Sequence, residues 1–170
     1  FKDAALAVRI RAKTMRDFGG TPSPFNSYMI LLGLQTLHLR MPRHVENAYR
    51  VGEYLMSHPK VKSVSYPGFE NHPQYKLAQK YFPKGPGGLF TFDAKDYETA
   101  RRVIESVKLC VHTANLGDAR TILTHPASTT HSQVSAEGLA RMGISREMVR
   151  VSVGIEDADD IIDDLKQALG

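Results

Sequence analysis

The residue best suited to chemistry in this sequence is Arg150, a guanidinium in the middle of the alternating stretch 148–153. The alternation predicts a strand with three valines on one face and Arg150 and Ser152 on the other. A strand holds a side chain firmly, and a guanidinium offers a planar pair of donors that matches a carboxylate. The same pattern also fits a structural salt bridge or a solvated edge position, so the local sequence leaves the role of Arg150 open.

Two loops rich in hydrogen-bonding groups follow other expected strands. They are Thr113-Ala-Asn-Leu-Gly-Asp118 and His125-Pro-Ala-Ser-Thr-Thr-His131. Because each loop follows a strand, each can present side chains at a rim of the sheet. If the first loop lies near Arg150, the amide of Asn115 can donate a hydrogen bond to the same carboxylate. The residues alone therefore indicate an anion-recognising domain, and they indicate no particular reaction.

Other reactive residue types favour structural roles. Three histidines, at positions 112, 125 and 131, match no compact zinc-binding spacing, so we expect no metal site. The single cysteine, Cys110, lies in an apolar stretch and is expected to be a small core residue rather than a nucleophile. One cysteine also excludes an internal disulfide and fits a reducing cytoplasm.

From residue 60 onward the pattern alternates between short strands and helices. The expected strands cover 61–66, 89–92, 109–113, 121–123 and 148–153. The expected helices cover 74–81, 97–107, 135–142 and 158–169. Strands separated by helices and joined by short loops predict an α/β fold, in which one antiparallel-type sheet is covered by helices on a single face.

The first part of the chain is expected to be helical. One helix is predicted over 4–17, ended by Gly19, and a long helix over 24–57 is expected to begin at the cap Ser23. Pro42 should bend this long helix near residue 38. Its segment 25–39 is apolar nearly all round, which predicts that another protein surface covers it.

Length and charge narrow the class of protein. A chain of 170 residues can bury a core and should hold one domain with an appendage. It contains no run of about 18 uncharged apolar residues and no signal peptide, so we expect no membrane contact. Ten Lys/Arg against four Asp/Glu in residues 1–66 make that part basic, but the charges are scattered along helices, so we expect no nucleic-acid partner. The start at Phe1 rather than Met suggests a fragment or a processed product.

Several long motifs, in order and over essentially the whole chain, resemble the pyridoxal-phosphate enzymes of cysteine and methionine metabolism. They are Ser23-Pro-Phe-Asn, Gly33-Leu-Gln-Thr-Leu-His-Leu-Arg-Met41, Arg43-His, Asn115-Leu-Gly-Asp118, His125-Pro-Ala-Ser-Thr-Thr-His-Ser132 and Val149-Arg-Val-Ser-Val-Gly-Ile-Glu-Asp157. The first motif and the form Pro126-Ala-Ser-Thr-Thr-His-Ser-Gln133 are most similar to the O-acetylhomoserine sulfhydrylases. Related γ-lyases and cystathionine γ-synthases share the framework.

The resemblance implies an aminotransferase-like fold of type I, a tetramer and γ-replacement chemistry. In that chemistry the cofactor is an electron sink, acetate leaves, and sulfide or a thiol adds to give homocysteine or methionine. Carried over by position, Arg150 binds the substrate α-carboxylate. Asn115 stands where the lyases often have a serine that contacts the same carboxylate. Ala114 stands where some relatives carry an acidic substrate contact, which argues against a cystathionine-type specificity.

The resemblance also implies that this chain is a C-terminal part. No lysine lies in a context that matches the cofactor-binding lysine, so residues 1–58 should be the end of the large cofactor domain with the connecting helix, and 59–170 the small domain. We therefore expect no catalytic or cofactor-binding residue in this chain, and no activity without the N-terminal part. Two alternatives remain: a stand-alone domain that binds amino acids through Arg150 and Asn115, and a scaffold in a partner complex.

Overall fold

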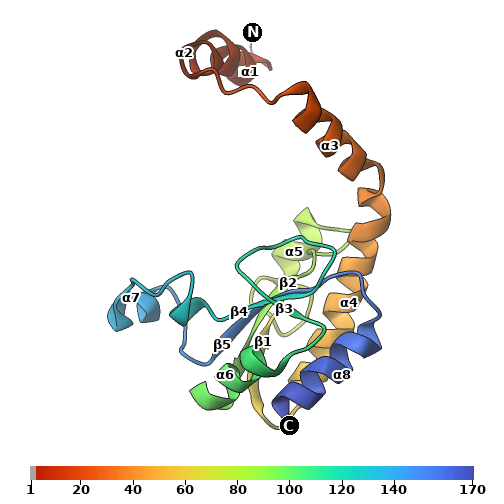
Figure 1. The fold of residues 1–170 in the computed structure, drawn as a ribbon, viewed down its shortest axis with the longest axis vertical. Helices are drawn as coiled ribbons and strands as arrows, with labels where there is room; N and C mark the ends of the chain where they lie inside the picture. The colour runs from red at the N-terminus through yellow and green to blue at the C-terminus, as the bar shows by residue number, and fades with distance from the viewer. Residues whose placement is uncertain (1–2) are drawn as a thin grey trace. The chain divides into compact units, whose positions relative to one another are not determined.

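The computed structural model describes residues 3–170, which form two compact units. One unit ends at His38, and the other runs from Leu39 to Gly170 (Figure 1). The second unit contains the sheet, and therefore both residues that the sequence selected as ligand contacts. No helix among the described residues has the length and apolar character needed to cross a membrane.

The first unit begins with a continuous helical segment where the sequence predicted one helix. Its parts are α1 (Ala5–Arg9), the π-helical stretch η1 (Ile10–Met15) and α2 (Arg16–Phe18). Gly19 ends the segment with a φ of 67°, a backbone conformation that glycine adopts without steric cost. Helix α3 (Pro24–Gln35) starts at Ser23, whose Oγ accepts a hydrogen bond from the backbone N–H of Asn26 at 3.2 Å. The expected cap is therefore confirmed.

The long helix predicted over 24–57 is broken into two. Helix α3 ends before Thr36, which has φ −104° and ψ 1°, and α4 (Leu37–Ser57) continues beyond it. We expected the bend near His38, because Pro42 lacks the N–H that would bind the carbonyl there. The structure keeps Pro42 inside α4 and breaks at Thr36 instead. The β-branched Thr36 follows Gly33 by one turn, and both residues have lower helix propensity than the leucines around them.

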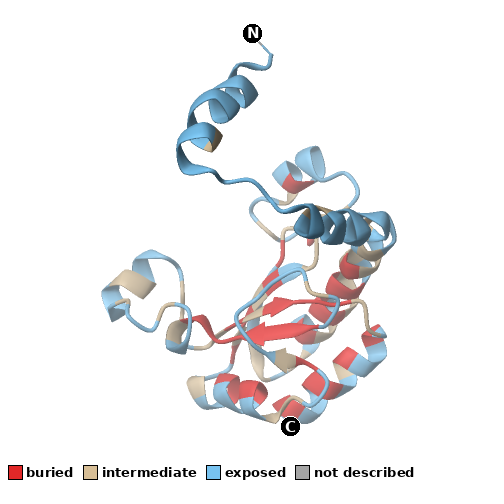
Figure 2. Ribbon diagram, turned by 45° about the horizontal axis from the view of Figure 1, so that its top comes forward, coloured by how far each residue is buried: buried red, intermediate tan, exposed pale blue. Residues whose placement is uncertain are grey.

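Helix α3 is uncovered in this chain. It contains no buried residue, and apolar side chains such as Phe25 and Leu31 are 70% and 62% exposed. Figure 2 shows α3 almost entirely in the colour of exposed residues. A helix that is apolar all round is normally buried by other protein, so its exposure here supports the expected partner surface.

The second unit is built on a five-stranded sheet with the order β1-β2-β5-β4-β3. The strands are β1 (Val61–Ser65), β2 (Leu89–Ala94), β3 (Val111–His112), β4 (Ile122–Thr124) and β5 (Met148–Ser152). All neighbouring pairs are antiparallel except β3 with β4, which run parallel. Strand β5 therefore lies at the centre of the sheet, between β2 and β4.

One face of the sheet packs against three helices, α4, α6 (Tyr97–Ser106) and α8 (Ala158–Leu169) (Figure 2). The core between them holds side chains from all of these elements: Val51, Leu55, Phe90, Phe92, Val103, Leu123, Val149, Val151, Ile161 and Leu165. The predicted fold class, a sheet with helices on one face, is confirmed. The connections contain two further helices and a 3-10 turn: α5 (Tyr75–Tyr81), η2 (Pro126–Ser128) and α7 (Ala136–Arg141).

Strand β3 is shorter than the strand predicted over 109–113. The backbone N–H groups of Lys108, Leu109 and Cys110 instead donate to the carboxylate of Asp164 in α8, at 2.8, 2.9 and 2.8 Å. A backbone donor that binds a side-chain carboxylate is not available to a strand neighbour. The prediction was wrong here because the competing acceptor lies more than fifty residues later in the chain.

Candidate carboxylate-binding site

Arg150 lies in the middle of the central strand β5. Its cross-strand partners are Thr91 on β2 and Thr124 on β4, so these three side chains share the sheet face opposite the helices, which we call the open face. Its neighbours Val149 and Val151 are fully buried on the helical side. The alternation therefore turns the half-buried guanidinium of Arg150 to the open face, as the sequence predicted.

The guanidinium of Arg150 keeps most of its donors available. Its Nη2 donates to the backbone carbonyl of Asn115 at 3.1 Å and, more weakly, to Oγ1 of Thr124 at 3.4 Å. No carboxylate of residues 3–170 lies within ion-pair distance of it. The acid of the adjacent loop, Asp118, is paired with Arg120 at 2.9 Å, and this contact lowers the pKa of Asp118 to about 2. A structural salt bridge within the described chain therefore does not explain Arg150.

Asn115 lies beside Arg150, but it contacts the arginine through its backbone. Its side-chain Oδ1 accepts a hydrogen bond from the N–H of Leu116 at 2.9 Å, which fixes the orientation of the amide. The amide Nδ2 makes no hydrogen bond to any residue in the described part of the chain, and the side chain is exposed. The structure thus brings the two predicted ligand residues together and leaves a donor on each of them for a bound anion.

The loop that carries Asn115 lies along β5 and its extension. Gly117 N–H donates to Oγ of Ser152 at 3.0 Å, and Ile155 N–H donates to the carbonyl of Ala119 at 2.8 Å. Gly154 permits this close approach, because a Cβ there would lie 2.3 Å from the carbonyl oxygen of Ala119 and 2.5 Å from the carbonyl carbon of Arg120. Backbone atoms cannot move aside as a flexible side chain can.

The variant Gly154→Ala should therefore separate the loop from β5. We expect a loss of roughly 1 to 3 kcal/mol in unfolding free energy, the usual effect of overpacking a close contact. Thermal unfolding of the purified protein measures this loss of stability. Gly20→Ala is the control, because a Cβ at Gly20 meets no atom within 4 Å in this chain. An unchanged midpoint for Gly154→Ala would contradict the close packing described here.

The three histidines have separate surroundings. His125 is buried, and its ring nitrogens contact Oγ of Ser128 and the carbonyl of Arg146, both at 2.7 Å. His131 contacts Thr130 at the surface, and His112 is exposed. No group of three or more potential metal ligands occurs among residues 3–170.

Cys110 is buried in the core, as expected. Burial raises the pKa of its thiol above the ordinary value, and the nearby carboxylate of Asp164 raises it further. A neutral, buried thiol is a poor nucleophile.

Two hydroxyl groups at this site were not identified as functional from the sequence. Thr124 is buried, and its Oγ1 donates to the carbonyl of Thr113 at 2.7 Å while accepting from Arg150. Ser152 is also buried, and it holds Gly117. The alternation did place Ser152 on the face of Arg150, which was the available signal. No sequence feature could have identified Thr124, because its position opposite Arg150 depends on the order of the strands in the sheet.

The family described as Cys/Met metabolism PLP-dependent enzyme matches residues 2–170. This chain belongs to that family. It is 48% identical over 170 residues to O-acetyl-L-homoserine sulfhydrylase 1 of Thermus thermophilus, covering 99% of this chain and 40% of the relative. It is 46% identical to the homocysteine synthase of Schizosaccharomyces pombe, with the same two coverages. L-methionine gamma-lyase of Treponema denticola is also 46% identical, over 89% of this chain and 38% of the lyase.

A solved structure supports the same assignment to the Cys/Met metabolism family. It is a putative O-acetylhomoserine (thiol)-lyase from Campylobacter jejuni with N'-pyridoxyl-lysine-5'-monophosphate, and it superposes with a TM-score of 0.90 at 44% sequence identity. The match covers 96% of this chain and 39% of that one. The chain thus spans about two fifths of the length of the relatives it matches. The predicted family and its dependence on pyridoxal phosphate are confirmed.

Proposed function

We propose that this chain is the C-terminal part of an O-acetylhomoserine sulfhydrylase and binds the α-carboxylate of the amino-acid substrate. The observation that carries the proposal is the guanidinium of Arg150, which is held on a central strand without an acidic partner among residues 3–170. An unpaired, half-buried cation in a rigid position is suited to an anionic ligand. The identity of 48% and 46% to a sulfhydrylase and a homocysteine synthase supports this subfamily.

Each side chain has a defined task in this proposal. Nη2 of Arg150 is oriented by the Asn115 carbonyl, and the other guanidinium N–H groups make no hydrogen bond among residues 3–170, so they are available to the carboxylate oxygens. Nδ2 of Asn115 donates a further hydrogen bond to the same group. Because Arg150 is fixed by a strand and not by a mobile loop, the bound amino acid is held in one orientation, which favours reaction.

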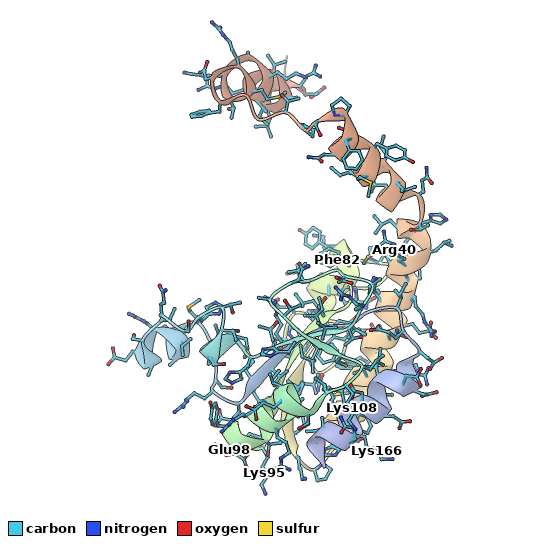
Figure 3. The ribbon with its side chains drawn as sticks, viewed as in Figure 1. Arg40, Phe82, Lys95, Glu98, Lys108 and Lys166 are labelled. Atoms are coloured by element: carbon cyan, nitrogen blue, oxygen red, sulfur yellow. The ribbon has the colours of Figure 1, made fainter. Side chains whose placement is uncertain are left out.

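Pyridoxal phosphate, when bound, supplies the electron sink for the reaction. We propose that its lysine and its phosphate-binding residues come from the N-terminal part, so that this chain is inactive alone. In support, every lysine of residues 3–170 is exposed or half-buried. Lys95, Lys108 and Lys166 lie in the region of α6 and α8 (Figure 3), and all three are exposed. A cofactor amine normally needs an enclosed site next to the substrate.

The proposed partner is the N-terminal part of the same enzyme. The exposed apolar surface of α3 is the feature in this chain that fits such a partner. We retain residues 1–58 as the end of the large domain with the connecting helix, and 59–170 as the small domain. A cytoplasmic homotetramer is part of the same proposal, and the mass of the native particle tests the tetramer.

A second candidate is the elimination reaction of a methionine γ-lyase. The identity of 46% to the lyase of Treponema denticola supports it. The task of Arg150 and Asn115 would be the same, because both reactions start from an amino acid with a free carboxylate. The two candidates differ in whether a second substrate adds after the leaving group departs.

The test uses the assembled enzyme, by which we mean this chain together with the N-terminal part, in one polypeptide or as two. With pyridoxal phosphate, it should form homocysteine from O-acetylhomoserine and sulfide, faster than it releases a keto acid from methionine. A faster release from methionine would favour the lyase. Activity with neither substrate, in a preparation that shows the cofactor's visible absorbance, would contradict both candidates.

A further inference from the structure

The attachment of the 113–118 loop to β5 follows a matched spacing. Arg150 and Ser152 are two residues apart on the same strand face, and their partners, the Asn115 carbonyl and the Gly117 N–H, are two residues apart in the loop. The loop therefore lies over the open face of β5, held by side chains of the strand and not by its backbone. Ser152 is only 4% exposed, and its hydrogen bond to Gly117 is partly shielded from water.

Few other contacts hold this part of the loop. Residues 113–117 are all exposed, so no buried side chain anchors them. Thr113 is fixed at the start by Leu123 and Thr124 on β4. Between Thr113 and Ala119, the hydrogen bonds to other elements among the described residues are those to Arg150 and Ser152. Gly117 has a φ of 73°, so its N–H direction depends on a turn that only glycine adopts easily.

We propose that Ser152 is a positioning residue for the substrate carboxylate. This inference rests on the proposed function. By holding Gly117, Ser152 sets the height of the loop over β5, so that the Asn115 carbonyl orients Nη2 of Arg150 and the Asn115 amide faces the same anion. Arg150 serves both the loop and the ligand. Ser152 contacts only the loop. Replacing Ser152 therefore changes substrate binding through the position of the loop and not through a lost contact with the substrate.

The variant Ser152→Ala should weaken binding through the carboxylate only. We expect the KM for O-acetylhomoserine to rise about tenfold, the effect of losing one hydrogen bond, while kcat and the KM for sulfide change by less than about threefold. Ser152→Thr keeps the hydroxyl and should restore the KM. Ser63→Ala is the matched control, because the Ser63 hydroxyl donates to Asp93 at 3.0 Å on β1, two strands from β5, and should change neither value.

A binding measurement gives a readout besides activity. Calorimetry on the assembled holoenzyme compares L-norleucine, which has no γ-leaving group, with L-norleucinol, which lacks the carboxylate. Ser152→Ala should weaken norleucine about tenfold and leave norleucinol unchanged. If norleucine and norleucinol are weakened equally, or if the binding of neither changes, the inference is overturned. If Ser152→Ala does not fold, Ser152→Cys replaces it, because a thiol is only a weak acceptor. Ser152→Cys should also weaken the binding of norleucine and leave the binding of norleucinol unchanged.

Arg150→Ala in the same experiment distinguishes a failure of the Ser152 role from a failure of the carboxylate site itself. If Arg150→Ala abolishes the preference for norleucine and Ser152→Ala does not reduce it, the positioning role is wrong and the carboxylate site stands. If Arg150→Ala leaves norleucine binding unchanged, the carboxylate site itself is wrong, and the role of Ser152 is wrong with it.

Discussion

Arg150→Ala in the assembled enzyme is expected to lower kcat/KM for the amino-acid substrate by roughly 30- to 1,000-fold. This range corresponds to about 2 to 4 kcal/mol for the loss of a charged, two-pronged contact. The loss should be large because the guanidinium has no acidic partner among residues 3–170, so its donors are available to the ligand. Steady-state kinetics with O-acetylhomoserine and sulfide measure the change.

Two further variants make the Arg150 result specific. Arg150→Lys should recover only part of the activity, because an ammonium is a point charge and cannot present the planar fork of a guanidinium. Arg120→Ala removes an arginine of the same region that is already paired with Asp118, and it should leave kcat/KM within about threefold of the native value. Full turnover in Arg150→Ala would show that the carboxylate binds elsewhere.

Asp164→Ala is expected to produce the largest loss of stability. The buried carboxylate of Asp164 accepts hydrogen bonds from three consecutive backbone N–H groups, those of residues 108–110, and from Nε2 of Gln167 at 3.1 Å. Alanine would leave these backbone donors without an acceptor. Unsatisfied donors cost roughly 1 to 3 kcal/mol each when fully buried, and since two of these bonds are only partly buried we expect about 3 kcal/mol in total.

A thermal scan of the assembled enzyme measures the effect of Asp164→Ala. A loss of about 3 kcal/mol should lower the midpoint of this region by roughly 6 to 12 °C. Asp163→Ala is the matched control, because Asp163 is the preceding residue of α8 and is exposed. A midpoint equal to that of the control would mean that the three backbone groups find other acceptors.

The contribution of Asp164 should also depend on pH. Burial raises the pKa of Asp164, but the hydrogen bonds from the backbone N–H groups of residues 108–110 outweigh it, and the pKa in the folded protein is lowered. A lowered folded pKa means that the carboxylate stabilises the protein above its unfolded pKa, about 3.9, and that this stabilisation is lost as the pH falls through the folded pKa. The stability difference between the native enzyme and Asp164→Asn should therefore be constant above about pH 5 and shrink below about pH 4. A constant difference down to pH 3 would contradict the lowered pKa.

Local features of the fold were predictable because they depend on near neighbours in the sequence. The alternation over 148–153 correctly predicted a strand with Arg150 and Ser152 on one face, since successive strand side chains must point to opposite sides. The helix predicted over 158–169 is α8, and the residue before it, Asp157, caps it by accepting from the N–H of Asp159 at 2.9 Å. Gly19 and Ser23 end and begin helices for similarly local reasons.

Features that depend on distant residues were not predictable. The strand expected over 109–113 is reduced to Val111–His112, because Asp164 captures the preceding backbone groups. The helix breaks at Thr36 and not near His38, although Pro42 was the strongest local signal for a bend. The sequence pattern also cannot show that β3 and β4 pair in parallel, since pairing depends on how the intervening loop returns to the sheet.

The candidate site likewise combines a feature that follows from local sequence with contacts that depend on the tertiary structure. The sequence by itself determined that Arg150 stands on a strand opposite the apolar face, because that orientation follows from alternation alone. Only the tertiary structure decided which groups lie beside it: the Asn115 carbonyl, the Thr124 hydroxyl, and Gly117 held by Ser152. It also decided that no acid of residues 3–170 pairs with Arg150. These contacts join residues up to 35 positions apart, so they depend on the strand order around β5 and not on any local pattern.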